Sequence, residues 1–164
     1  PIVNDTTQAT KQTVHYEGAG KATPKDNVQD NYTFKGEHNE ATGVTTWTEQ
    51  SHTYDAVPTP EIKGYYADKK EVSGATVTPT NPTSTTTVTY HELGKIIPVD
   101  PKDQPIPDAP TPTYNNDPND PTKGGETPTP TIPGYHTDTP NVTPDPNNPG
   151  GNTHVVYTPI VNDT

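Results

Sequence analysis

Several residue types are missing from this sequence, and each absence removes a class of protein. The chain has no cysteine, so neither disulfide bonds nor thiolate metal sites can hold it together. It has no methionine and no arginine, and its ten basic residues are all lysine, against 21 acidic residues. The formal net charge of −11 repels phosphate backbones, which argues against nucleic acid as a partner. No apolar run is long enough to cross a bilayer, so no direct membrane contact is expected.

The residues that are abundant favour β-structure over disorder. An apolar content of 24% together with 22 prolines is typical of disordered chains. However, 32 threonines stand against three serines, and threonine is β-branched and suits a pleated surface. Apolar residues also alternate along short segments, as half-buried strands require: Val14 and Tyr16, Tyr32 and Phe34, Val88 and Tyr90, Val155 and Tyr157. The sequence therefore predicts a mainly β fold with little helix.

Proline content divides the chain into two modules. Residues 1–94 contain six prolines and residues 95–164 contain sixteen, and the change falls where a strand-like segment meets Gly94. The hexapeptide PIVNDT occurs both at 1–6 and at 159–164, which indicates one period of a longer tandem array. The predicted organisation is an inter-repeat linker at 1–10, a first β domain at 11–94, a second, proline-rich β domain at 95–158, and the start of the next repeat at 159–164.

The two modules share landmarks in the same order. PTPEIKGYYAD at 58–68 matches PTPTIPGYHTD at 128–138, which aligns Gly64 and Tyr65 with Gly134 and Tyr135. Each module closes on an alternating strand, TVTY ending at Tyr90 and HVVY ending at Tyr157. The expected core of the second module consists of its apolar residues: Ile96, Ile97, Val99, Ile106, Tyr114, Ile132, Tyr135, Val142, Val155, Val156 and Tyr157.

Alternation and turn residues predict the strands of the first module, near 11–17, 30–37, 43–49, 52–57, 70–78 and 85–92. The segment PKDNVQD at 24–30 is allowed at most one helical turn.

These motifs resemble the mucus-binding repeats (MucBP or Mub type) of large surface adhesins of lactobacilli and related Gram-positive bacteria. TVHYEGAG, TGVTTW, PTPEIKGYYADKKEV and TVTY are similar to the first domain of such a repeat. GKIIPVDPKDQPIPDAPTPTYNNDPNDPTKGG, PTIPGY and VVYTP are similar to the second. The resemblance implies two small ubiquitin-like β-grasp domains, an anchor to the cell wall and binding to mucus glycoproteins. We expect the two domains to lie end to end as an elongated rod.

Three aromatic residues are candidates for stacking on sugars, because flat aromatic faces suit pyranose rings. Trp47 lies on a predicted hairpin strand and is expected to be half-buried. Tyr65 follows a corner glycine, as Tyr135 does, so a packing role competes with a binding role. Tyr66 should point the opposite way from Tyr65 and is expected to be the more exposed of the two.

Four acidic residues are candidates for a calcium site. Asp100 and Asp103 lie in VDPKD, and Asp117 and Asp120 lie in YNNDPNDP, so carboxylates come close together on loops. Neither loop has a complete calcium-binding pattern, and aspartate commonly caps proline turns instead. No other cofactor is indicated. The three serines lie in no nucleophile-elbow pattern, so the chain is not expected to be an enzyme.

The sequence thus predicts an extracellular, wall-anchored adhesin repeat, monomeric within its array, that contacts mucin glycans weakly and many times. Two alternatives stay open. The repeat could be a spacer that binds nothing, or it could bind host proteins such as immunoglobulins through an exposed sheet edge.

Overall fold

The computed structural model describes residues 2–161, and they are almost entirely β-strand, turn and extended chain. Within this range the one helical element is a 3-10 turn, η1 (Gly20–Ala22), and no helix has the length and hydrophobicity needed to cross a membrane. The prediction of a mainly β fold is confirmed. The chain divides into two compact units. The first comprises residues 1–17, 24–59 and 71–88, and the second comprises 18–23, 60–70 and 89–164.

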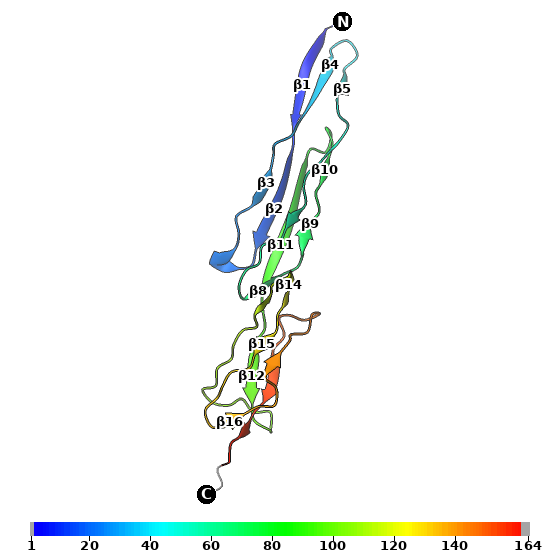
Figure 1. The fold of residues 1–164 in the computed structure, drawn as a ribbon. Helices are drawn as coiled ribbons and strands as arrows, with labels where there is room; N and C mark the ends of the chain where they lie inside the picture. The colour runs from blue at the N-terminus through cyan, green and yellow to red at the C-terminus, as the bar shows by residue number, and fades with distance from the viewer. Residues whose placement is uncertain (1, 162–164) are drawn as a thin grey trace. The chain divides into compact units, whose positions relative to one another are not determined.

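The first unit contains the longer ladders. β4 (Thr33–Asn39) is the centre of a three-stranded antiparallel sheet with β1 (Val3–Ala9) on one side and β5 (Val44–Trp47) on the other (Figure 1). β2 (Lys11–Glu17) pairs with β3 (Asn27–Gln29) and adjoins β11 (Thr83–Glu92), which crosses the division between the units. Two short pairs complete it: β6 (His52–Thr53) with β10 (Thr76–Val77), and β7 (Val57–Pro58) with β9 (Glu71–Val72).

Alternation along the strands builds the core of the first unit. In β2 every second side chain is buried, and Phe34 on β4 packs with Tyr54 and Val77 in a cluster bordered by Tyr32 and Trp47. The buried Gln12 side chain is satisfied, because its amide donates to the Asp55 carbonyl and its oxygen accepts the Ala75 amide.

The second unit is made of many short strand pairs. β12 (Ile96–Val99) runs parallel to β18 (Thr153–Val156), and β8 (Tyr65–Ala67) pairs with residues 90–92 of β11. The remaining pairs are antiparallel: β13 (Asn116–Asp117) with β14 (Asp120–Gly124), β15 (Thr127–Pro128) with β17 (Asn141–Val142), and β16 (Tyr135–His136) with β19 (Thr158–Pro159). Short strands are what a segment with so many prolines allows, since proline cannot donate to a ladder.

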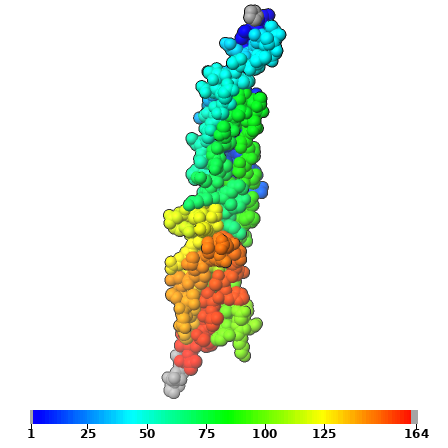
Figure 2. Space-filling view, turned by 90° about the vertical axis from the view of Figure 1, so that its right-hand side faces the viewer, coloured from blue at the N-terminus to red at the C-terminus, as the bar shows by residue number. Residues whose placement is uncertain are grey.

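One apolar cluster holds the second unit together, and Figure 2 shows the surface that surrounds it from one side. Its buried members are Leu93, Ile96, Ile106, Tyr114, Ile132, Val142, Val155 and Tyr157. Most of the expected core is therefore confirmed, with Val99 buried as well and Tyr135 packed at the edge of the cluster. Val156 is 55% exposed, because it alternates with the buried Val155, and the cluster recruits Leu93 from before the expected start of this module.

Two further segments differ from the sequence-based predictions. Residues 3–9, placed in a linker from the sequence, form β1 and pair with β4 along their whole length. Residues 27–29, where a helical turn was allowed, form β3. Both segments have weak alternation of their own and become strands through a neighbouring strand. The domain boundaries themselves, and an end-to-end arrangement of the domains, stay predictions.

The shared landmarks of the two modules correspond to shared hydrogen bonds. We call residues 60–66 with 90–93 the first corner, and residues 130–136 with 157–160 the second corner; both belong to the second unit. In each corner a tyrosine hydroxyl donates to a proline carbonyl, Tyr90 to Pro60 at 2.7 Å and Tyr157 to Pro130 at 2.5 Å. The landmarks shared in the sequence thus coincide with shared hydrogen bonds in the structure.

The backbone of the two corners also matches. Gly64 and Gly134 have φ angles of 85° and 84°, in the left-handed region that favours glycine. The carbonyl of Gly64 accepts the Leu93 amide at 2.9 Å, and the carbonyl of Gly134 accepts the Ile160 amide at 2.8 Å. The same glycine turn therefore receives the end of a strand in both corners.

Candidate functional site

A shallow polar groove runs across the three-stranded sheet of the first unit. It has a volume of about 450 Å³ and lies over Gly36, near the middle of the central strand β4. Its rim is formed by six side chains on three strands and just beyond β5: Asp5, Thr7, Lys35, Glu37, Thr46 and Thr48. Each of these six residues is exposed. Thr6, Gly36 and Trp47 complete its lining. We call this feature the polar groove.

The register of the sheet explains why these side chains gather there. Cross-strand partners place their side chains on the same face of a sheet. Glu37 lies opposite both Asp5 on β1 and Thr46 on β5, and Lys35 lies opposite Thr7. The outer face of the sheet therefore carries carboxylates, hydroxyls and one ammonium group, all free to contact a ligand.

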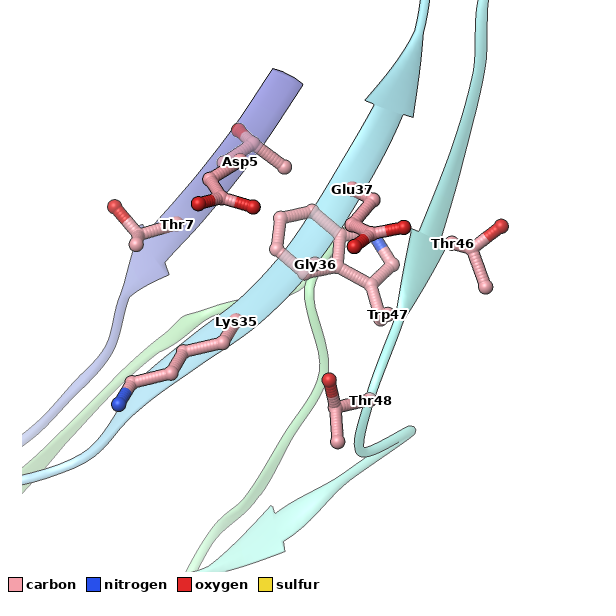
Figure 3. Close-up of a pocket in the computed structure, with 9 residues that line it drawn as sticks. Asp5, Thr7, Lys35, Gly36, Glu37, Thr46, Trp47 and Thr48 are labelled. Atoms are coloured by element: carbon pink, nitrogen blue, oxygen red, sulfur yellow. The ribbon is translucent and has the colours of Figure 1, made fainter. Parts of the chain in front are cut away.

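Trp47 lies on the other face of the same sheet. Its cross-strand partner is Gly36, and its ring packs edge-on to the buried Phe34 at 6.4 Å between centroids. A side chain at position 36 would clash, since a Cβ there would come within 2.8 Å of the indole Cε3 atom. The glycine thus allows the indole to lie against β4, as Figure 3 shows. Trp47 is half-buried, as expected, and together with Gly36 it belongs to the lining of the polar groove.

Tyr65 and Tyr66 are both half-buried, and their surroundings differ from the expectation. Tyr66 packs against the apolar cluster of the second unit, with its ring 5.5 Å from that of His91. Tyr65 instead borders a separate groove of about 420 Å³ together with Lys63, Lys95 and Thr113. The packing of the second unit makes Tyr66 the side chain that contacts the apolar cluster, whereas Tyr65 borders the separate groove.

Three of the four candidate calcium ligands cap turns, and the fourth, Asp103, contacts a histidine. Asp100 accepts the amides of Lys102 and Gln104, and Asp117 accepts the amide of Asn119. The carboxylate of Asp103 contacts the His154 ring at 2.8 Å. Among residues 2–161 there is no group of three or more histidine, aspartate or glutamate side chains that could hold a metal ion.

The surroundings of Asp120 shift its pKa. Partial burial opposes its ionisation, but two hydrogen bonds from Thr122 and the positive charges of Lys123 and Lys70 outweigh this effect. The pKa of Asp120 is therefore below its ordinary value, and the carboxylate stays charged to stabilise the β13–β14 hairpin.

The sequence did not reveal the polar groove as a site. Asp5 and Thr7 fall in the segment assigned to a linker, and Glu37, Lys35 and Thr46 carry no motif. The only available signal was polar alternation on the hairpin that contains β4 and β5. Pairing of that hairpin with β1, about thirty residues earlier, creates the groove.

Fold and groove together define a small β module with an open, hydroxyl- and carboxylate-lined surface. A family model described as the Muc B2-like domain matches residues 3–94, which is more than half of the chain. The chain belongs to the Muc B2-like domain family. The resemblance seen in the sequence motifs is thereby confirmed.

Several solved structures are similar to this chain. The mucin-binding domain of Spr1345 from Streptococcus pneumoniae is 25% identical over 57% of this chain and 98% of its own length, with a TM-score of 0.45. A MucBP domain of LBA1460 from Lactobacillus acidophilus is 29% identical, over 56% and 97%, with a TM-score of 0.40. The type 2 repeat of the mucus binding protein MUB from Lactobacillus reuteri is 28% identical, over 52% and 50%, with a TM-score of 0.40. A comparison with curated proteins gives no match.

Proposed function

We propose that this chain is a repeat unit of a Gram-positive surface adhesin and that it contacts mucus glycoproteins through its polar groove. The observation that carries the proposal is the match of the Muc B2-like domain to residues 3–94, the segment that contains the whole groove. The proposed role is binding without catalysis, at the outer surface of a bacterium whose cell wall holds the parent protein.

The chemistry of the groove suits sugar hydroxyls. Carboxylates such as Asp5 and Glu37 accept hydrogen bonds from hydroxyls, and threonine hydroxyls both donate and accept. The groove is shallow and open, so each contact is weak, with a hydrogen bond contributing about 1 kcal/mol. Tandem repetition would raise the avidity through effective concentration.

The charge of the chain points to neutral sugars. Sialate and sulfate groups are usually held by charge-assisted, often bidentate donors, and arginine is the best of these. The chain has none, and Lys35 is the only cationic side chain that borders the polar groove. We expect binding to desialylated mucin to be at least as strong as binding to sialylated mucin at neutral pH.

The test is mucin binding by the chain and by three groove variants, Asp5→Asn, Glu37→Gln and Thr46→Val. Each removes or weakens one acceptor without changing side-chain size much, and we expect each to lower affinity about fivefold. Glu61→Gln and Thr111→Val are the matched controls, because both residues are exposed and lie outside the groove.

The outcomes separate the alternatives. Mucin binding that all three groove variants retain in full would move the site away from these three side chains, for example to a sheet edge. No binding of the unaltered chain to intact or deglycosylated mucin would support the spacer. Binding that survives complete deglycosylation would support recognition of protein, with immunoglobulin as a further ligand to assay.

A further inference from the structure

The first corner is covered by the rest of the second unit. Leu93, whose amide bonds to the Gly64 carbonyl, is only 3% exposed and belongs to the apolar cluster with Ile96 and Tyr114. The Asn116 side chain completes the cover. It accepts the Gly64 amide at 2.9 Å and donates to the carbonyls of Ile62 at 2.8 Å and Tyr65 at 2.9 Å.

The second corner has the same backbone, and its Ile132 and Tyr157 are buried in the same cluster, but the end of its strand is exposed. Ile160 occupies the position of Leu93, yet it is 53% exposed, and the following Val161 is 80% exposed. Within residues 2–161 no side chain bonds to the Gly134 amide or to the carbonyls of Ile132 and Tyr135, which correspond to the three groups held by Asn116. A surface that is closed in one corner is therefore open in the other.

The sequence at the open corner identifies what fits it. Residues 159–164 repeat residues 1–6, so Ile160 and Val161 correspond to Ile2 and Val3. In the first unit the carbonyl of Ile2 accepts the Glu40 amide at 2.9 Å, and Val3 pairs with Asn39. In the second corner the equivalent isoleucine, Ile160, donates its amide to the carbonyl of Gly134. The two bonds use different groups of this isoleucine, its carbonyl in one and its amide in the other.

Exposed apolar side chains are found mainly at the two copies of this segment, at residues 1–6 and 159–164. Among residues 2–161 seven large apolar residues are exposed. Four of them belong to one copy or the other of this segment, Ile2, Val3, Ile160 and Val161, and Val44 borders a groove with Val3. Exposed apolar side chains in a group indicate an interaction surface. Joining the two ends through one shared segment would bury several of them together.

We propose that the second corner is the docking surface for the first unit of another copy of this chain, joined through a shared PIVNDT segment. The amide of the shared isoleucine bonds to Gly134 of the preceding copy, and its carbonyl bonds to Glu40 of the following copy. The segment is a continuous strand that belongs to both copies, without a flexible linker. This junction does not depend on what the polar groove binds.

The test is a two-copy chain in which residues 7–164 follow directly after Thr164, so that the central hexapeptide is shared. Amide hydrogen exchange is measured for Ile160 and Glu40 at the centre and for the same residues at the two free ends. Both ends lie in one molecule, so they serve as internal references. We expect at least tenfold slower exchange at the centre than at the ends, because the central bonds cannot fray.

Two variants sharpen the experiment. Insertion of Gly-Ser-Gly-Ser after the central Ile160 should return both central amides to the rates of the free ends. Ile160→Ser at the centre should raise the exchange rate of the central Glu40 amide about tenfold, whereas Val28→Ser, at an exposed valine outside both ends, should leave it unchanged. Central amides that exchange as fast as terminal ones, or an insertion without effect on them, would overturn the proposal.

Discussion

The first and second corners share a backbone and differ in what lies on it. Both use a glycine with positive φ, a tyrosine hydroxyl on a proline carbonyl and a strand amide on the glycine carbonyl. They differ at the end of the strand: Leu93 is buried in the apolar cluster and Asn116 bonds to the turn in the first corner, whereas Ile160 is exposed in the second. The comparison teaches that local sequence specifies the turn, whereas the chain that packs on it decides whether the turn is core or surface.

The largest expected difference between the corners is at Leu93 and Ile160. Leu93→Ala removes buried methyl groups and leaves a cavity, so we expect the free energy of unfolding to fall by about 3 kcal/mol. Ile160→Ala alters an exposed side chain and should cost less than about 0.5 kcal/mol. Urea denaturation of the two variants measures both values, and equal losses would mean that the corners are packed alike.

The next effect concerns Asn116, which has no counterpart on the second corner. Asn116→Ala leaves one amide and two carbonyls of the first corner without their side-chain partner, and we expect a loss of about 2 kcal/mol. Asn119→Ala, in the same hairpin, is the control and should change stability by less than about 0.5 kcal/mol. Thermal unfolding of the pair tests this, and similar melting temperatures would show that the cap does not stabilise the corner.

A smaller loss of stability, equal in the two corners, is expected for the tyrosine hydrogen bond that both corners make. Tyr90→Phe and Tyr157→Phe each remove one hydroxyl donor from a proline carbonyl, and each should cost about 1 kcal/mol. A large inequality between the two, measured by urea denaturation, would contradict the equivalence of the corners.

Tyr157 also gives the corner a dependence on alkaline pH. Burial raises the pKa of the Tyr157 phenol, although a hydrogen bond with Thr129 partly opposes this. The stability associated with the neutral phenol is therefore present below the ordinary tyrosine pKa of about 10 and is lost as the pH rises through the higher folded value. Unfolding measured between pH 9 and 11 should show this loss, and Tyr157→Phe should reduce it.

The smallest effect is at Asp120, in the hairpin that carries Asn116. Asp120→Asn weakens the turn at Thr122 and should cost less than about 1 kcal/mol near neutral pH. Because the folded pKa is lowered, the carboxylate stabilises the fold above the unfolded pKa of about 4, and this contribution is lost as the pH falls through the folded value. The variant should lose less stability than the unaltered chain between pH 5 and pH 2, and equal losses in an acid titration would contradict this role.

The sequence by itself determined the local features of this protein. Threonine-rich alternation predicted strands such as β2, whose buried side chains Val14 and Tyr16 were among the pairs used to identify it. The glycine turns and the closing strands predicted the duplication, and the motifs predicted the family. These features depend on φ preferences and on side-chain periodicity within a few residues, which a single sequence displays directly.

Only the tertiary structure decided which of these features could form a site. The register of β1, β4 and β5 put Asp5 and Glu37 on one face and the Trp47 ring on the other, which no segment specifies alone. Asn116 reaches Gly64 from 52 residues away, and Leu93 is buried because the second unit closes around it. Such contacts depend on the pairing and packing of distant segments. Leu93 and Ile160 each follow a closing tyrosine by three residues and bond to the corner glycine, yet Leu93 is buried and Ile160 is exposed.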